Sequence, residues 1–118
     1  MAQGVGCRFL HRRGSDAPVE LVNPFHGIYA AVTRMDRDGE PAGGWYPEEK
    51  MTREEALRAF TIWAAKGSFE EEKKGSLEAD KLADFVVIDR DLMKIPEQQL
   101  KDINVLTTVV GGEVVYEK

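Results

Sequence analysis

The sequence predicts an α+β fold, with helices in the first half of the chain and a small antiparallel sheet in the second. Two stretches, 24–34 and 52–66, carry apolar residues at helical spacing. A compact run rich in β-branched residues follows at 85–88. Two further such runs are separated only by Gly111-Gly112, which is typical of a β-hairpin. The length of 118 residues suits one domain.

Composition and charge favour a globular protein with no nucleic-acid and no membrane partner. Hydrophobic residues make up 42% and charged residues 31% of the chain. The net charge of −5 disfavours nucleic-acid binding, which needs a basic patch. We interpret the short basic runs Arg12-Arg13 and Lys73-Lys74 as solvated surface. No apolar run approaches the ~20 residues of a membrane span, and no signal-peptide core is present. Cys7 is the single cysteine and is expected to be a small buried residue. We therefore expect a cytoplasmic protein.

The first helix is predicted to begin at Asn23-Pro24. Asparagine is a good N-cap, and proline is tolerated at the first helical position because its missing N–H would be unpaired there. One apolar stripe then runs through about Arg34 and is formed by Phe25, Ile28, Tyr29 and Val32.

A long loop at 35–50 separates this helix from the second, which is predicted over 52–66. The loop contains three glycines and two prolines. Thr52 and Glu55 have the spacing of a capping box, and Gly67 is a natural C-terminal stop. The predicted buried face consists of Ala56, Leu57, Phe60, Trp63 and Ala64.

The remaining elements are mostly strands. Phe85–Ile88 is predicted to be a strand buried on both faces. Residues 96–103 are expected to form a short helix or turn. The runs 105–110 and 113–116 are expected to pair as the two strands of a hairpin.

Several spaced segments resemble a known family. The sequence is similar to the C-terminal end of metal-dependent hydrolases of the amidohydrolase superfamily, in the amidohydrolase-3 branch that also holds the exoenzyme regulatory protein family. The similarity covers about residues 14–118. Its segments are GSDAPVE, NPFHGIYAAVTR, GEPAGGWYPEEKMTREEALRAFTIWAA, KGSLEADKLADFVVID and VLTTVVGGEVVYEK.

The resemblance implies a division of the chain. In that family a (β/α)₈ barrel carries the site, and a smaller composite β-sandwich is built from both chain ends. By this mapping, residues 1–13 are a leader or frayed segment. Residues 14–74 are the remnant of the last barrel βα unit with a long loop. Residues 75–118 supply strands of the sandwich, all within one compact domain.

Asp16 is the candidate site residue. The resemblance implies that its segment ends the eighth barrel strand. There its carboxylate is a catalytic residue and metal ligand of the intact family enzyme, binding a divalent metal such as zinc or taking a proton from the attacking water. Active sites of such barrels lie at the C-terminal ends of strands. From the residues alone, an aspartate in a Ser-Asp-Ala-Pro turn also serves as a turn or cap acceptor.

The other ligands of the family are absent from this sequence. The family places a His-x-His pair, a carboxylate or modified lysine and further histidines upstream, whereas this chain has only His11 and His26, both read as surface or structural. A hydrolytic zinc site takes three protein ligands. His11-Arg12-Arg13 also cannot form the buried strand that should precede Gly14. We therefore expect Asp16 to be non-functional in this chain alone, and the chain to hold no metal cofactor.

Three functions remain open. The first is an inactive C-terminal fragment, from a truncated or split gene, of an enzyme that hydrolyses C–N bonds in amides or cyclic amides. The second is a stand-alone binding or assembly module, such as the partner subunit of a split enzyme. The third is a small hydrolase whose site is completed across an oligomer. The expected partner of this chain is the missing barrel portion or a second copy in a homo-oligomer.

Two local features depart from the family or remain ambiguous. Ala79-Asp80 stands where the family usually has a glycine before the lysine, but aspartate tolerates left-handed turn geometry. The loop at 39–49 carries Trp45 and Tyr46, which could form an aromatic wall at a pocket mouth or simply pin the loop to the body.

Overall fold

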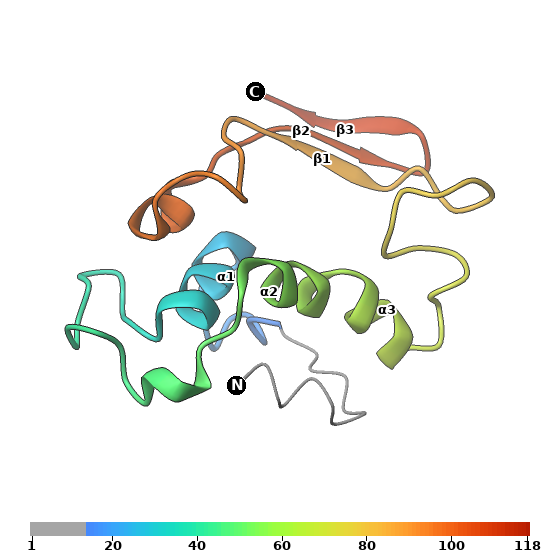
Figure 1. Cartoon of the computed structure of the whole chain (residues 1–118). Coiled ribbons are helices and arrows are strands. Elements are labelled where there is room, and N and C mark those ends of the chain that lie inside the picture. The colour runs from blue at the N-terminus through green and yellow to red at the C-terminus, as the bar shows by residue number, and fades with distance from the viewer. Residues whose placement is uncertain (1–13) are drawn as a thin grey trace.

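A computed structural model describes residues 14–118 and confirms helices in the first half and a three-stranded antiparallel sheet in the second (Figure 1). The expectations for residues 1–13, including those for Cys7 and His11, lie outside the described residues. The elements are α1 (Pro24–Thr33), the 3₁₀ turn η2 (Pro47–Glu49), α2 (Arg53–Phe60), α3 (Ile62–Gly67), β1 (Phe85–Ile88), the 3₁₀ helix η3 (Glu97–Asp102), β2 (Val105–Val110) and β3 (Glu113–Glu117).

Helix α1 begins and ends where local chemistry predicts. The Asn23 side chain accepts a hydrogen bond from the Phe25 N–H at 2.9 Å, and Pro24 occupies the first turn. The helix stops at Arg34, which adopts a left-handed conformation with φ 58° and donates its N–H to the carbonyl of Ala30.

The second predicted helix is interrupted, which corrects the expectation of one helix over 52–66. Its start is confirmed, because the Thr52 hydroxyl accepts from the Glu55 N–H at 3.1 Å and the Glu55 carboxylate accepts from the Thr52 N–H at 2.9 Å. At Thr61 the backbone leaves the helical region, with φ −127° and ψ −97°, and separates α2 from α3. The Thr61 hydroxyl donates to the carbonyl of Leu57 at 2.7 Å, a bond that bends helices.

The buried face of α2 and α3 also differs from the prediction. Leu57 is exposed and Trp63 is only half-buried, although both were expected to face the core. Small residues are buried instead, namely Ala56, Ala59 and Ala65. The helices can approach one another closely at this face. A Cβ placed on Gly27 of α1 would lie 2.6 Å from Cζ of Phe60.

The sheet has the order β1-β2-β3, with both pairs antiparallel. The predicted hairpin is confirmed. Val110 pairs with Glu113, and Gly111 and Gly112 both have positive φ, 60° and 82°, as the tight turn requires. The prediction that Phe85–Ile88 is buried on both faces is wrong. Strand β1 forms an edge of the sheet, and Phe85, Val86 and Val87 are 37%, 49% and 45% exposed.

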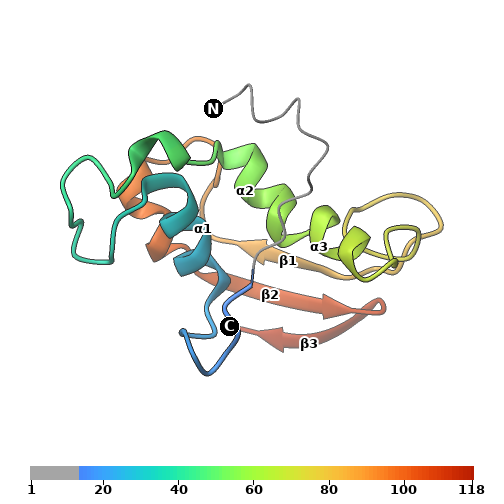
Figure 2. The same cartoon turned by 90° about the horizontal axis from the view of Figure 1, so that it is seen from below.

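The core lies among the helices rather than beneath the sheet. It joins α1 to α2, to η3 and to the segment before η3, and its buried members are Phe25, Ile28, Tyr29, Val32, Ala56, Leu92, Leu100 and Ile103. Seen from below, the sheet extends beside the helical layer, with α2 and α3 on the side of β1 (Figure 2). Within residues 14–118, no helix has the length and apolar character needed to cross a membrane.

Candidate functional site

Asp16 lies in an exposed turn ahead of α1. Its backbone is left-handed, with φ 50°, a region that aspartate enters more readily than most residues. Its carbonyl accepts a hydrogen bond from the Val19 N–H at 2.9 Å. The expected strand end is not formed, since residues 14–16 have no strand structure. A parallel barrel strand needs neighbouring strands for its hydrogen bonds, and the described residues supply none at this point.

The described part of the chain does not assemble a metal site around Asp16. Among residues 14–118, no group of three or more histidine, cysteine, aspartate or glutamate side chains is placed to hold a metal ion. His26 lies in the first turn of α1, half-buried, and its Nδ1 is a buried atom without a hydrogen-bond partner in this region. One exposed carboxylate does not fit the three-ligand requirement of a hydrolytic zinc site.

The loop between α1 and α2 presents an aromatic pair to solvent. Trp45 and Tyr46 are 61% and 56% exposed, and their rings pack edge-to-face with centroids 4.6 Å apart. The guanidinium of Arg34 lies 5.4 Å from the Trp45 ring centroid, and its Nε donates to the Trp45 carbonyl at 3.0 Å. These contacts hold the end of the loop against α1 while leaving both rings accessible.

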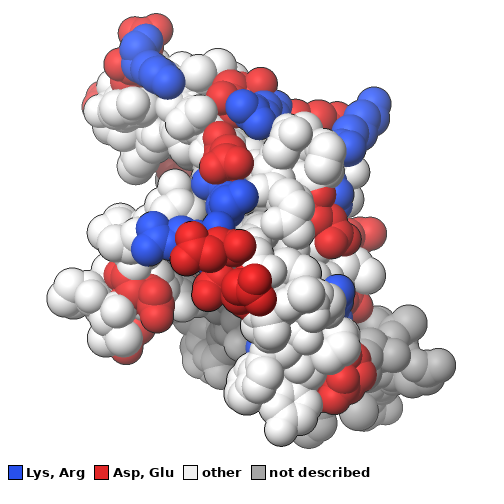
Figure 3. Space-filling model, turned by 90° about the vertical axis from the view of Figure 1, so that its left-hand side faces the viewer, with Lys and Arg blue, Asp and Glu red and all other residues white. Residues whose placement is uncertain are grey.

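Acidic and basic side chains are interspersed on the face shown in Figure 3.

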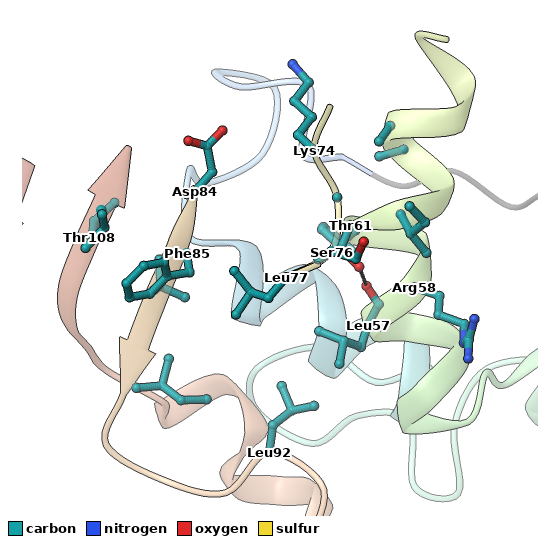
Figure 4. A pocket seen from close by; sticks show the side chains of 18 of the residues that line it. Leu57, Arg58, Thr61, Lys74, Ser76, Leu77, Asp84, Phe85, Leu92 and Thr108 are labelled. Carbon is teal, nitrogen blue, oxygen red and sulfur yellow. Dashed lines mark hydrogen bonds between the residues drawn. The ribbon is translucent and has the colours of Figure 1, made fainter. Parts of the chain in front are cut away.

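A cleft of about 1370 Å³ lies between the α2–α3 layer and the sheet. Leu57 of α2 and Leu77 of the segment after α3 project into it, and Phe85 of β1 forms part of its wall (Figure 4). Asp16 does not line this cleft. Sequence reasoning missed the cleft because it treated Leu57 as core. The available signal was Leu77, an apolar residue that follows Gly75 and Ser76, and the structure leaves it 70% exposed.

One ion pair at the margin of the cleft joins Lys74 to Glu70. Lys74 Nζ contacts the Glu70 carboxylate at 2.7 Å. This hydrogen bond raises the pKa of Lys74 and, together with one from Ser68, lowers the pKa of Glu70. Both side chains are about 40% exposed, so the pair is a surface interaction with little effect on stability.

The turn at 75–81 is an internally bonded unit. The Ser76 hydroxyl donates to the Glu78 carboxylate, and Lys81 Nζ lies 2.7 Å from Ser76 Oγ and 3.0 Å from Glu78 Oε2. The hydrogen bond from Ser76, followed by that from Lys81, lowers the pKa of Glu78. Asp80 has φ 72°, which confirms that aspartate can adopt the left-handed turn there. With each group paired, the turn orients the chain between α3 and β1 and offers no unpaired nucleophile.

Comparison with known proteins finds one matching family profile and three similar curated proteins. The sequence profile described as "Amidohydrolase family" matches residues 13–116. The protein LONG AFTER FAR-RED 3 of Arabidopsis thaliana is 40% identical over 105 residues, which cover 87% of this chain and 17% of that protein. An N-substituted formamide deformylase of Arthrobacter pascens is 36% identical over 104 residues, covering 88% and 19% of the two chains. A putative amidohydrolase of Bacillus subtilis is 33% identical over 105 residues, covering 89% and 20%.

A solved structure shares part of the fold. An amidohydrolase from Thermotoga maritima superposes with a TM-score of 0.51 at 24% identity, over 61% of this chain and 17% of that one. The chain thus spans only 17–20% of the length of these curated relatives.

Proposed function

This chain belongs to the amidohydrolase family, and from that membership we propose that it is the C-terminal part of a metal-dependent hydrolase acting on C–N bonds of amides or cyclic amides. The observation that carries the proposal is the family match over residues 13–116 in a chain that spans a fifth or less of its relatives. Residues 14–74 would then be the last barrel βα unit and its loop. Residues 75–118 would supply strands of the composite sandwich.

Asp16 is the proposed catalytic carboxylate of the intact enzyme. Its place just before the first helix of the matched segment supports this assignment, as does its exposure. The divalent metal of that enzyme, such as zinc, would be held mainly by residues outside this chain, because the described residues do not form a ligand set. We therefore propose that the chain is inactive alone and needs the barrel portion as its partner. We also propose that it resides in the cytoplasm.

A binding or assembly module is the second candidate. The apolar cleft and the exposed sheet favour it, because soluble monomers seldom leave such surfaces uncovered. In this reading the chain would be the partner subunit of a split enzyme and would act by docking.

A chimera tests the hydrolase assignment. Residues 14–118 would replace the matched segment of the Arthrobacter deformylase, to which the chain is 36% identical. We expect the chimera to hydrolyse an N-substituted formamide and Asp16→Ala to abolish turnover. Asp38→Ala, which changes an exposed loop acid, should leave turnover intact. Circular dichroism would establish that each chimera is folded. Full activity of a folded Asp16→Ala chimera would refute the role of Asp16.

A further inference from the structure

Helix α3 ends on a left-handed phenylalanine. The Glu70 N–H donates to the Ala65 carbonyl at 2.9 Å. The Phe69 N–H donates to the Lys66 carbonyl at 3.1 Å. These two bonds form a Schellman motif, which places Phe69 just after the C-cap with φ 60°. Glycine usually occupies that position, and a bulky residue with positive φ is an outlier. The backbone at Phe69 is therefore strained.

The side chain of Phe69 gains almost no burial that could offset this strain. Phe69 is 91% exposed, the largest value for any large hydrophobic residue within residues 14–118. A single exposed apolar side chain is ordinary on a protein surface. An exposed aromatic ring on a left-handed backbone is not, because strained residues cluster at functional positions such as ligand clamps. The combination points to a role for this ring outside the described fold.

The turn that carries Phe69 is held in place by its neighbours. The Ser68 hydroxyl lies 3.1 Å from a carboxylate oxygen of Glu70, and Lys74 Nζ lies 2.7 Å from the same carboxylate. Gly75 then packs closely on α3, since a Cβ placed there would lie 2.8 Å from a side chain of that helix. A ring presented from a fixed backbone loses little conformational freedom on binding.

The position of this turn suits contact with an adjoining domain. The C-terminal end of α3 lies at the right-hand end of the helical layer in Figure 1. The chain spans 17–20% of the length of its curated relatives, and the proposed function makes their remaining length the portion that adjoins it. Aromatic side chains are enriched among the residues that anchor protein interfaces, where they fill well-packed pockets.

We propose that Phe69 is an anchor residue that inserts into an apolar pocket of the hydrolase portion that this chain lacks. The inference rests on the proposed function, because that function supplies the partner. Burial of the ring in the pocket would offset the strain of its backbone. Phe69 is a docking residue and takes no part in the chemistry assigned to Asp16.

Hydroxyl-radical footprinting of the unmodified residue tests the anchor in the free chain and in the chimera with the Arthrobacter deformylase. Trypsin cuts after Lys66 and Lys73, and the resulting peptide GSFEEEK has Phe69 as its single aromatic residue. We expect rapid oxidation of this peptide in the free chain. The rate should fall about 10-fold in the chimera, since anchor residues lie in fully desolvated pockets. Phe25, a core residue that is 6% exposed, should be oxidised slowly in both proteins and is the reference.

Two substitutions separate the effect of the ring from that of the strain. In the free chain, Phe69→Gly should raise the urea midpoint of unfolding, because glycine adopts a positive φ without strain. Phe69→Ala keeps the Cβ and should leave that midpoint nearly unchanged. In the chimera both substitutions should lower the temperature of unfolding, because both remove the ring from its pocket. Phe69→Gly should therefore change stability in opposite directions in the two proteins.

The outcomes distinguish the anchor from the proposed function. If a folded chimera hydrolyses an N-substituted formamide while Phe69 is oxidised as fast as in the free chain, the anchor is wrong and the proposed function stands. A chimera that does not fold would overturn the proposed function and, with it, the partner on which the anchor depends. Slow oxidation of Phe69 in the free chain, or a loss of stability there in Phe69→Gly, would show that the ring packs within this chain and would also overturn the proposal.

Discussion

The carboxylate of Asp89 shows how one hydrogen-bonded side chain ties the sheet to the segment before β2. Its oxygens accept from the backbone N–H and the side-chain Nδ2 of Asn104, both at 3.0 Å. These bonds favour the ionised form and lower the pKa of Asp89. Since the folded pKa lies below the unfolded one, the interaction stabilises the fold above the ordinary carboxyl pKa. That contribution is lost as pH falls through the lowered value.

We predict that Asn104→Ala raises the pKa of Asp89 toward its ordinary value, because it removes the side-chain donor that contributes most to the shift. Carbon-13 NMR titration of the carboxyl groups would measure this change. Stability of the variant should also fall less steeply with acidification than stability of the parent chain. The pKa of Glu78, which is lowered by Ser76 and Lys81, serves as an internal control. An unmoved Asp89 titration would show that Asn104 does not donate to it in solution.

A second prediction at the residue scale concerns Gly27, where α1 passes close to α2. A Cβ added there would meet Cζ of Phe60 at 2.6 Å, so the ring must move. Overpacking of this kind costs about 1–3 kcal/mol, against a helix-propensity gain of about 1 kcal/mol. Gly27→Ala should therefore destabilise the fold in urea denaturation, and adding Phe60→Leu should recover part of the loss. Gly14→Ala, which meets no atom within 4 Å, should be neutral.

At the scale of elements, the capping box of α2 gives the sharpest expectation. Thr52→Ala removes the hydroxyl that accepts from the Glu55 N–H and should reduce the free energy of unfolding by about 1 kcal/mol. Glu55→Gln is the matched control. Glutamine also completes a capping box, so this variant should stay within about 0.5 kcal/mol of the parent chain. Equal losses in both variants would attribute the effect to charge near the helix start.

Elements were predictable where their signals are local. The cap at Asn23, the box at Thr52 and the turn at Gly111-Gly112 are each specified within a few residues, and all three are confirmed. The break at Thr61 was missed because a threonine in a helical pattern only bends the chain when its hydroxyl bonds the preceding turn. The exposure of β1 was missed because burial depends on a neighbouring layer that a single strand's sequence does not specify.

At the scale of the whole molecule, the sequence identified the family but could not complete a site. Asp16 was proposed from its segment, and the structure places it in an exposed turn, with no group of three potential metal ligands among residues 14–118. The cleft beside β1 was not predicted because it is formed by segments far apart in sequence, from Phe25 to Val110. The chain spans 17–20% of the length of its curated relatives, so most of the length of those relatives has no counterpart in it.

The metal content of the isolated chain is the decisive measurement at this scale. A hydrolytic site needs three protein ligands around the ion. The whole sequence has two histidines and one cysteine, and residues 14–118 contain no cluster of three potential ligands. We therefore expect the purified chain to contain far less than one zinc, iron or manganese per molecule by elemental analysis, and to show no hydrolysis of an N-substituted formamide above background. Asp16→Ala should change neither result. About one metal per chain, retained through dialysis and lost in Asp16→Ala, would contradict this expectation, because a single exposed carboxylate would then be part of a complete site.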